Sequence, residues 1–193
     1  MDWKNTLKKA WYFIWEDDSI LSWLVNIVLA FVLIKFLVYP GLGLLLGTTH
    51  PVVAVVSGSM EHDGSFSNWW ESQKGFYDAY NITDAEFKDY RFNNGFNKGD
   101  IMILKGVAPE DIRVGDVLVY RTARPDPIIH RTIKIYADNG KLYFQAKGDH
   151  NYASNQDETR ISEGQIVGRA FIRVPLLGWI KIGFVELLKL VIP

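Results

Sequence analysis

The sequence has no cysteine among its 193 residues. This absence excludes disulfide bonds, a thiolate nucleophile and cysteine-ligated zinc, and it leaves the redox compartment undecided. An excess of one charge is also missing, because 21 basic residues stand against 22 acidic residues and the net charge is −1. The chain therefore has no electrostatic basis for binding nucleic acid. Histidine is scarce, with four in the chain.

Hydrophobic residues, in contrast, make up 48% of the chain, and many of them lie in one run over residues 19–47. The only charge in this run is Lys35. Because about 20 helical residues cross the hydrocarbon core of a bilayer, the run predicts a transmembrane helix from Ile20 to about Tyr39. We expect Pro40-Gly41 to end this helix, and the rest of residues 19–47 to connect the anchor to the next domain.

The N-terminal segment, residues 1–18, interleaves lysines with aromatic residues and predicts an amphipathic segment in the membrane interface. Three lysines precede the span, whereas no Lys or Arg occurs between Lys35 and Lys74. This asymmetry predicts an N-terminus inside the cell and a single-pass protein of the cell membrane whose main domain lies on the outer face. The endoplasmic reticulum membrane is the alternative.

A second apolar stretch closes the sequence at residues 174–193. Its charges, Lys181, Glu186 and Lys189, fall within an arc of about 140° on a helical wheel. This pattern predicts an amphipathic helix that lies on a membrane, and a second transmembrane span is the alternative.

Residues 48–173 contain short runs rich in Val, Ile and Tyr, bounded by Gly, Asp, Asn or Pro. They predict a mainly β domain, either a small barrel or a folded antiparallel sheet. Residues 61–97 break the pattern because they are polar, aromatic and partly helical in periodicity. We expect them to form an insertion between strands, with Trp69-Trp70 packed on the barrel rather than in the membrane interface.

Two residue types favour serine chemistry without establishing it. Ser57-Gly58-Ser59 ends an apolar run, and such a tripeptide is usually a turn. His130 stands between β-branched residues, so it lies in a strand, where it is either a fixed general base or a half-buried structural histidine. A nucleophilic serine needs such a base together with donors for the oxyanion.

Asp149 and Asp157 occur in the polar segment 146–158, which reads as a loop with Asx turns. An aspartate here is also suited to accept a hydrogen bond from an imidazole and to fix its tautomer. The same segment contains His150, which raises the question of a metal site. No closely spaced ligand pair such as His-x-x-x-His is present, so we expect no metal.

The order of these segments resembles type I signal peptidase. The resemblance covers most of residues 20–178, with residues 61–97 outside it. After the single span, the matching segments are SGSM at 57–60, KGDIMIL at 98–104, VGDVLVY at 114–120, IIHRTI at 128–133, KGDHN at 147–151 and GQIVGRAFIRVPLLG at 164–178. The pair His130-Arg131 is similar to the archaeal and endoplasmic-reticulum branch, which activates the serine with histidine instead of lysine. The long insertion looks archaeal.

The resemblance implies a fold and a function. The fold is a β-rich domain behind a membrane anchor, and the activity is that of a serine endopeptidase that removes signal peptides after small residues at positions −3 and −1. It implies Ser59 as nucleophile and His130 as base, with Asp157 as the nearest match to the acid that orients the imidazole. Asp149 is expected to hold the strand and loop geometry.

In this scheme the backbone N–H of Ser59 and the hydroxyl of Ser57 stabilise the oxyanion, and no cofactor is needed. The expected partners are secretory preproteins and membrane lipid, with the protein-secretion translocon as a further candidate. The alternative from another class of protein is a catalytically inactive, membrane-anchored binding module of the same fold.

Overall fold

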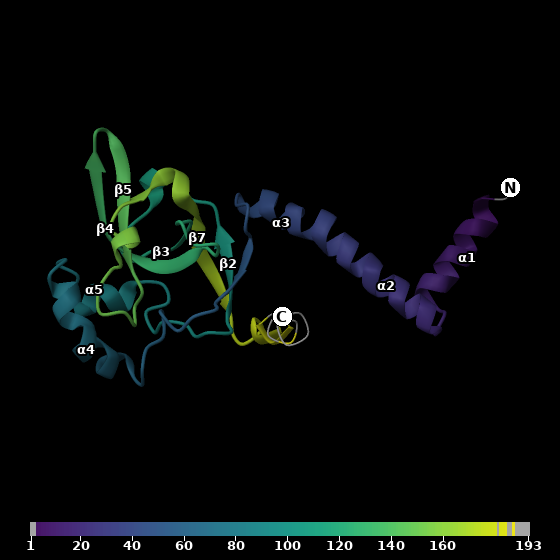
Figure 1. The fold of residues 1–193 in the computed structure, drawn as a ribbon, viewed down its shortest axis with the longest axis horizontal. Helices are drawn as coiled ribbons and strands as arrows, with labels where there is room; N and C mark the ends of the chain where they lie inside the picture. The colour runs from purple at the N-terminus through teal and green to yellow at the C-terminus, as the bar shows by residue number, and fades with distance from the viewer. Residues whose placement is uncertain (1–2, 181, 185–186, 188–193) are drawn as a thin grey trace. The chain divides into compact units, whose positions relative to one another are not determined.

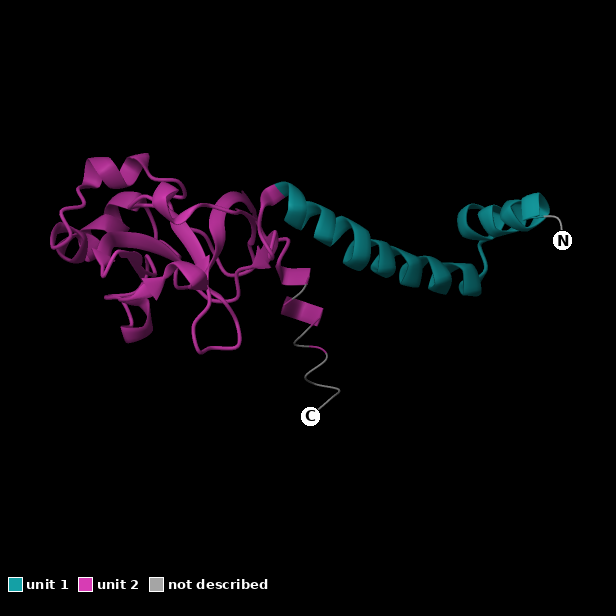
Figure 2. Ribbon diagram, turned by 90° about the horizontal axis from the view of Figure 1, so that it is seen from above, with its two compact units in different colours: residues 1–45 teal, residues 46–193 magenta. Residues whose placement is uncertain are grey.

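The computed structural model describes residues 3–180, 182–184 and 187. The chain divides into two compact units, Met1–Leu45 and Leu46–Pro193, which Figure 2 distinguishes by colour. The first unit is helical, and the second unit holds the β-sheet.

In the first unit, two side-chain hydrogen bonds join the second helix to the end of the first. The hydroxyl of Ser22 donates a hydrogen bond to the carbonyl of Phe13, and the side-chain amide of Asn26 donates to the carbonyl of Ile14 at 2.8 Å. These bonds satisfy carbonyls at the end of α1 that have no partner within the helix. The elements are α1 (Trp3–Trp15), α2 (Ile20–Leu33), the π-helical turn η1 (Ile34–Val38) and α3 (Tyr39–Leu46).

The apolar helix does not end at Pro40-Gly41, as the sequence analysis predicts, but continues to Leu46. The π-helical turn ends at Val38, two residues before Pro40. The N–H of Tyr39, the next residue, donates to the carbonyl of Ile34, five residues back. Such a turn adjusts the hydrogen-bond ladder where proline cannot donate. The continuous helix of 27 residues, with a mean hydropathy of 2.4, is long and apolar enough to cross a membrane.

The second unit is built on one seven-stranded sheet in the order β1-β2-β7-β3-β4-β5-β6. Every neighbouring pair is antiparallel. Figure 1 shows the sheet curling around its own interior. The strands are β1 (Val52–Ala54), β2 (Ile101–Lys105), β3 (Val117–Tyr120), β4 (Ile128–Asp138), β5 (Lys141–Lys147), β6 (Ile161–Ser162) and β7 (Ile166–Val174). Three single turns of 3₁₀ helix connect them, η2 (Pro109–Asp111), η3 (Gln156–Glu158) and η4 (Glu163–Gln165).

The predicted fold class, mainly β behind a membrane-length N-terminal helix, is confirmed. At the other end, β7 extends to Val174, and residues 179–180, 182–184 and 187 are helical. The remainder of the amphipathic helix predicted for residues 174–193 lies outside the described residues.

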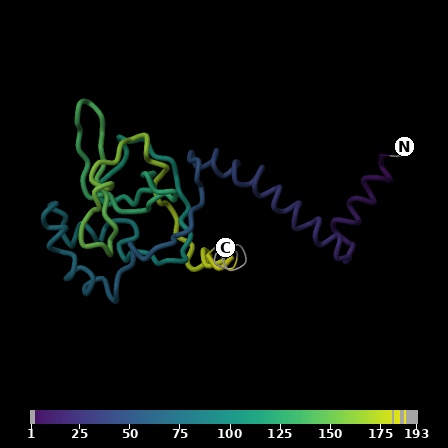
Figure 3. Tube along the Cα trace, in the orientation of Figure 1, coloured from purple at the N-terminus to yellow at the C-terminus, as the bar shows by residue number. Residues whose placement is uncertain are grey.

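The insertion, residues 61–97, folds into α4 (Phe66–Asp78) and α5 (Asp84–Asp89) against the sheet (Figure 3). Thr83 begins α5 with a capping box, in which its hydroxyl accepts from the Glu86 N–H. The two helices bury an aromatic cluster that packs on Ile133 of β4 and comprises Trp69, Trp70, Tyr77 and Phe87. Trp69 and Trp70 are therefore part of the domain interior.

Phe87 is the centre of this cluster, and we expect Phe87→Ala to lower the free energy of unfolding by about 3–5 kcal/mol. The Phe87 side chain is fully buried, and its ring contacts those of Trp69, Trp70 and Tyr77. Urea unfolding of the full chain in detergent measures the change. Tyr152→Ala is the matched control, because the Tyr152 side chain is 90% exposed. Equal losses in the two variants would contradict this account of the insertion.

Candidate active site

Ser59 lies in a turn that directly follows the first strand of the sheet. β1 ends at Ala54, and the sheet hydrogen bonding ends one residue later, where Val55 N–H donates to the Asp100 carbonyl at 2.8 Å. The turn is closed by a bond of 3.0 Å from the Glu61 N–H to the Gly58 carbonyl. The two interpretations of Ser57-Gly58-Ser59 in the sequence are thus compatible, because the turn is what holds Ser59 beyond the end of the strand.

His130 lies within β4, opposite Leu118 of β3, and is nearly buried. Its Nε2 atom is 2.9 Å from the Ser59 hydroxyl oxygen. This is the distance at which an imidazole can accept a hydroxyl proton. The structure therefore brings together the two residues that the resemblance selected, although 71 positions separate them in the chain.

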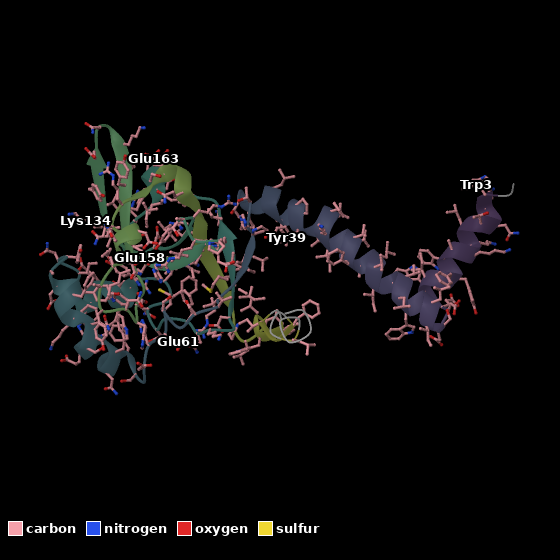
Figure 4. All side chains as sticks on the ribbon, viewed as in Figure 1. Trp3, Tyr39, Glu61, Lys134, Glu158 and Glu163 are labelled. Carbon is pink, nitrogen blue, oxygen red and sulfur yellow. The ribbon has the colours of Figure 1, made fainter. Side chains whose placement is uncertain are left out.

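The carboxylate beside the imidazole belongs to Glu158, whose Oε1 atom lies 2.7 Å from His130 Nδ1. Figure 4 shows Glu158 inside the β domain. Its other oxygen, Oε2, accepts a hydrogen bond of 2.9 Å from the Asn155 N–H. Burial alone would raise the pKa of Glu158, but the interactions with His130 and Asn155 outweigh burial and lower the pKa below its usual value. The carboxylate is consequently ionised at neutral pH.

Asp157, the residue predicted to orient the imidazole, does not contact His130. Its carboxylate is partly exposed and lies 3.4 Å from the guanidinium Nε of Arg124. The two acids are consecutive in the 3₁₀ turn η3, where successive side chains point about 120° apart, so only one of them can face the histidine. The resemblance points to an aspartate and not to Glu158, and the adjacent acids in "QDE" are the only signal of Glu158 in the sequence.

Asp149 lies in a different position, at the centre of a fully buried network. Its carboxylate accepts two hydrogen bonds from the guanidinium of Arg131, at 2.9 and 2.7 Å, and one of 3.2 Å from the hydroxyl of Tyr77. His62 Nε2 lies 3.1 Å from the second carboxylate oxygen. Burial alone would raise the pKa of Asp149, but the charge of Arg131 and these bonds outweigh burial and hold the pKa well below its usual range.

The insertion supplies much of this network. The ring of His62 stacks on Trp69 at a centroid distance of 3.6 Å, and the Trp69 indole donates to the backbone carbonyl of Asp149 at 3.1 Å. The ammonium of Lys147 donates to the side-chain carbonyl of Gln73 at 2.9 Å. Burial lowers the pKa of Lys147 to about 8. The insertion thus holds the loop that follows β5. The sequence pattern does not predict this role.

That loop returns to Ser59 by a backbone hydrogen bond of 2.9 Å, from the His150 N–H to the Ser59 carbonyl. The contact is close enough to require glycine at position 148. An added Cβ at Gly148 would lie 2.6 Å from the Ser59 carbonyl oxygen and 2.8 Å from His130 Nε2.

The two predicted oxyanion donors lie next to the nucleophile. The hydroxyl oxygens of Ser57 and Ser59 are 3.2 Å apart, and the Ser57 side chain is exposed to solvent. The backbone N–H of Ser59 donates to no other atom in the part of the chain that the structure describes. The Ser57 hydroxyl and the Ser59 N–H are therefore both candidates for binding a substrate carbonyl oxygen at Ser59.

A cleft of about 600 Å³ opens in front of Ser59 and His130. Its apolar lining comprises Ala54 and Val56 of the β1 segment, Pro125 and Pro127, and Ile128 and Ile129 at the start of β4. The charged residues Arg124 and Asp126 line it as well. Of the neighbouring valines, Val56 lines the cleft, whereas Val55 is part of the hydrophobic core and Val53 packs against that core. Within the described ranges, no three His, Asp or Glu side chains come together as metal ligands do.

Together, these distances define a serine, a histidine and a buried carboxylate in the order of proton transfer, which is the arrangement that serine hydrolases use. Sequence comparison indicates which serine hydrolases are related. No protein-family model matches the chain.

The chain is similar to the signal peptidase complex catalytic subunit SEC11C of Homo sapiens, with 30% identity over 155 residues. The alignment covers 76% of this chain and 63% of the human protein. Similarity extends to the catalytic subunits named sec11 in Neurospora crassa and SEC11 in Yarrowia lipolytica, each 26% identical, over 76% and 79% of this chain and 71% and 73% of the relatives.

The predicted resemblance to signal peptidase is therefore confirmed. The chain spans 63% of the length of the human relative. These relatives are eukaryotic and do not support the archaeal source suggested by the insertion.

The buried pair of Asp149 and Arg131 yields a prediction on stability. Asp149→Asn leaves the Arg131 guanidinium buried without its counter-charge, and we expect it to lower the free energy of unfolding by about 3–5 kcal/mol at pH 7. Asp157→Asn, the matched control, removes a carboxylate in a partly exposed ion pair and should cost less than about 1 kcal/mol. Urea unfolding of the full chain measures both changes.

The pH dependence of this difference has a defined sign. The pKa of Asp149 is lower in the folded chain than its ordinary value of 3.8, so its contribution is complete above the unfolded-state pKa and is lost as pH falls through the folded-state pKa. The gap between wild type and Asp149→Asn should stay constant from about pH 7 to 5 and shrink below about pH 4. A gap that widens in acid would contradict the assignment.

Proposed function

We propose that the chain is a membrane-anchored serine endopeptidase that removes N-terminal signal peptides from secretory preproteins after small residues at −3 and −1. The observation that carries the proposal is the contact series from Ser59 through His130 to Glu158, beside a cleft with an apolar wall. The similarity to signal peptidase catalytic subunits supports the proposed substrate class.

In the proposed mechanism His130 Nε2 accepts the proton of Ser59 as the serine oxygen attacks the scissile carbonyl. The Ser59 N–H and the Ser57 hydroxyl stabilise the negative charge on the carbonyl oxygen. Glu158 fixes the proton on His130 Nδ1 and stabilises the imidazolium. His130 then protonates the leaving amine, and a water molecule activated by the same histidine hydrolyses the acyl-enzyme. No cofactor takes part.

Selection of the substrate rests on two features. The shallow surface formed by Val56, Ile128 and Ile129 suits the small side chains that precede the cleavage site. Because Ser59 follows the apolar helix by 13 residues, the same membrane that holds the enzyme also holds the signal peptide, which raises the effective concentration of substrate.

The location and partners form part of the proposal. The lysines that precede the apolar helix favour a cytoplasmic N-terminus, so the β domain would lie on the outer face of the cell membrane or, alternatively, in the lumen of the endoplasmic reticulum. Lipid contacts the exposed apolar helix, and the translocon that delivers preproteins is a further proposed partner.

Ser59→Ala should abolish cleavage of a preprotein that carries an Ala-x-Ala site, because the alanine side chain has no nucleophile. Purified full-length chain in detergent, assayed by the appearance of the mature protein on a gel, measures this. Ser65→Ala is the matched control and should retain activity, because Ser65 caps α4 and does not line the cleft. Full activity of Ser59→Ala would reject the peptidase and leave the binding module as the explanation.

Glu158→Gln should lower kcat by about 10²- to 10⁴-fold, because the amide cannot stabilise the imidazolium of His130. Asp157→Asn, one residue earlier in the same turn, should change kcat by less than about twofold, since an exposed charge interacts weakly with distant groups. The kcat values come from cleavage of the same preprotein at saturating concentration. A larger loss of kcat from Asp157→Asn than from Glu158→Gln would identify Asp157 as the acid, as the resemblance implies.

A further inference from the structure

A second groove, with a volume of about 780 Å³, lies between helix α4 of the insertion and the loop that follows Gly148. The mechanism above uses none of its open surface. Its lining is rich in amide and hydroxyl side chains, and comprises Asp63, Asn68, Trp69, Ser72, Gln73 and residues 150–155.

This groove is continuous with the active-site cleft. Asn151 and Asn155 line both, so they form the boundary at which one passes into the other. At the same boundary, the His150 N–H bonds to the carbonyl of Ser59, which places the start of the groove beside the nucleophile. A chain that leaves the active site past these residues enters the groove.

One difference in lining assigns the direction of the substrate: Val56, Ile128 and Ile129 line the cleft, whereas no Val, Ile or Leu among the described residues lines the groove. The cleft at Ser59 and His130 has the apolar wall that small residues before the scissile bond require. The groove offers side-chain amides and hydroxyls, which can hydrogen-bond to an extended peptide backbone, and the exposed ring of Tyr152. It therefore suits the polar chain on the other side of the scissile bond.

One lining residue carries a formal charge, the carboxylate of Asp63, which is 82% exposed. It lies 3.5 Å from Nδ1 of His150, whose imidazole is half exposed. An unburied carboxylate at the side of the groove repels acidic side chains and attracts cationic ones.

We propose that this groove binds the first residues of the mature segment of the preprotein, immediately after the scissile bond, in extended form, and that Asp63 disfavours acidic residues there. The proposal rests on the proposed function. It gives the insertion a second role, since α4 then contributes a substrate-binding surface in addition to holding the loop.

The first test fills the groove. Two substrates share one signal peptide; one continues into a mature segment of several residues, and the other ends in a fluorogenic arylamine directly after the cleavage site. Ser72→Trp, on the exposed side of α4, should lower the ratio of kcat/KM for the long substrate to that for the short one by about tenfold, the loss expected from one or two displaced hydrogen bonds.

Lys74→Trp is the matched control, because Lys74 lies on the same helix, is exposed and does not line the groove. It should leave the ratio of the two substrates unchanged. An unchanged ratio in Ser72→Trp, or an equal fall in both variants, would overturn the proposal. If the wild-type chain cleaves neither substrate, the proposed function itself fails, which is a different result.

The second test removes the charge of Asp63 without enlarging its side chain. Long substrates that differ only in carrying Lys or Asp within the first mature residues should differ in kcat/KM in favour of Lys. Asp63→Asn should reduce this preference by about two- to fivefold, as expected for an exposed charge pair, and high salt should reduce it in the wild type. Asp89→Asn, an exposed acid of the insertion outside the groove, is the control. A Lys preference that survives Asp63→Asn would overturn the role of Asp63.

Discussion

The buried ion pair between Arg131 and Asp149 is the interaction on which the geometry of the site depends. Arg131 follows His130 in β4, so the pair ties the strand that carries the imidazole to the loop that follows β5. The same guanidinium donates to the carbonyls of Gly115 and Phe92, which ties both segments to the strand connections and to the insertion. Because an uncompensated charge in the interior is very unfavourable, these segments have few alternative arrangements.

The position of Glu158 depends on the loop that follows β5. From Asp149 the chain passes the Ser59 carbonyl and then forms the 3₁₀ turn that turns Glu158 inward and leaves Asp157 at the surface. Glutamate has one more methylene than aspartate, so it reaches His130 from a backbone position further away. The loop and the longer side chain together place the Glu158 carboxylate at Nδ1 of His130.

The proposed substrate path runs through two connected hollows, which Asn151 and Asn155 both line. In the proposed assignment, the aliphatic side chains of Val56 and β4 contact the end of the signal peptide, and the groove beside α4 contacts a chain that will remain in water. A membrane-length helix that precedes the domain suits an enzyme whose substrate arrives in the same bilayer. The insertion is central to this path because it forms one side of the groove.

The sequence by itself determined the class of fold and the apolar helix, since alternation and run length are properties of local stretches. The pairing of Ser59 with His130 followed only from the order of motifs along the chain, through the resemblance, and the tertiary structure supplied the contact. The sequence could not determine where the helix ends, because a π-helical turn absorbs Pro40. The choice of Glu158 over Asp157, and the use of the aromatic insertion to hold Asp149, depended on tertiary structure. Which side chain of a turn faces inward, and what a buried charge contacts, are set by packing between segments far apart in the chain.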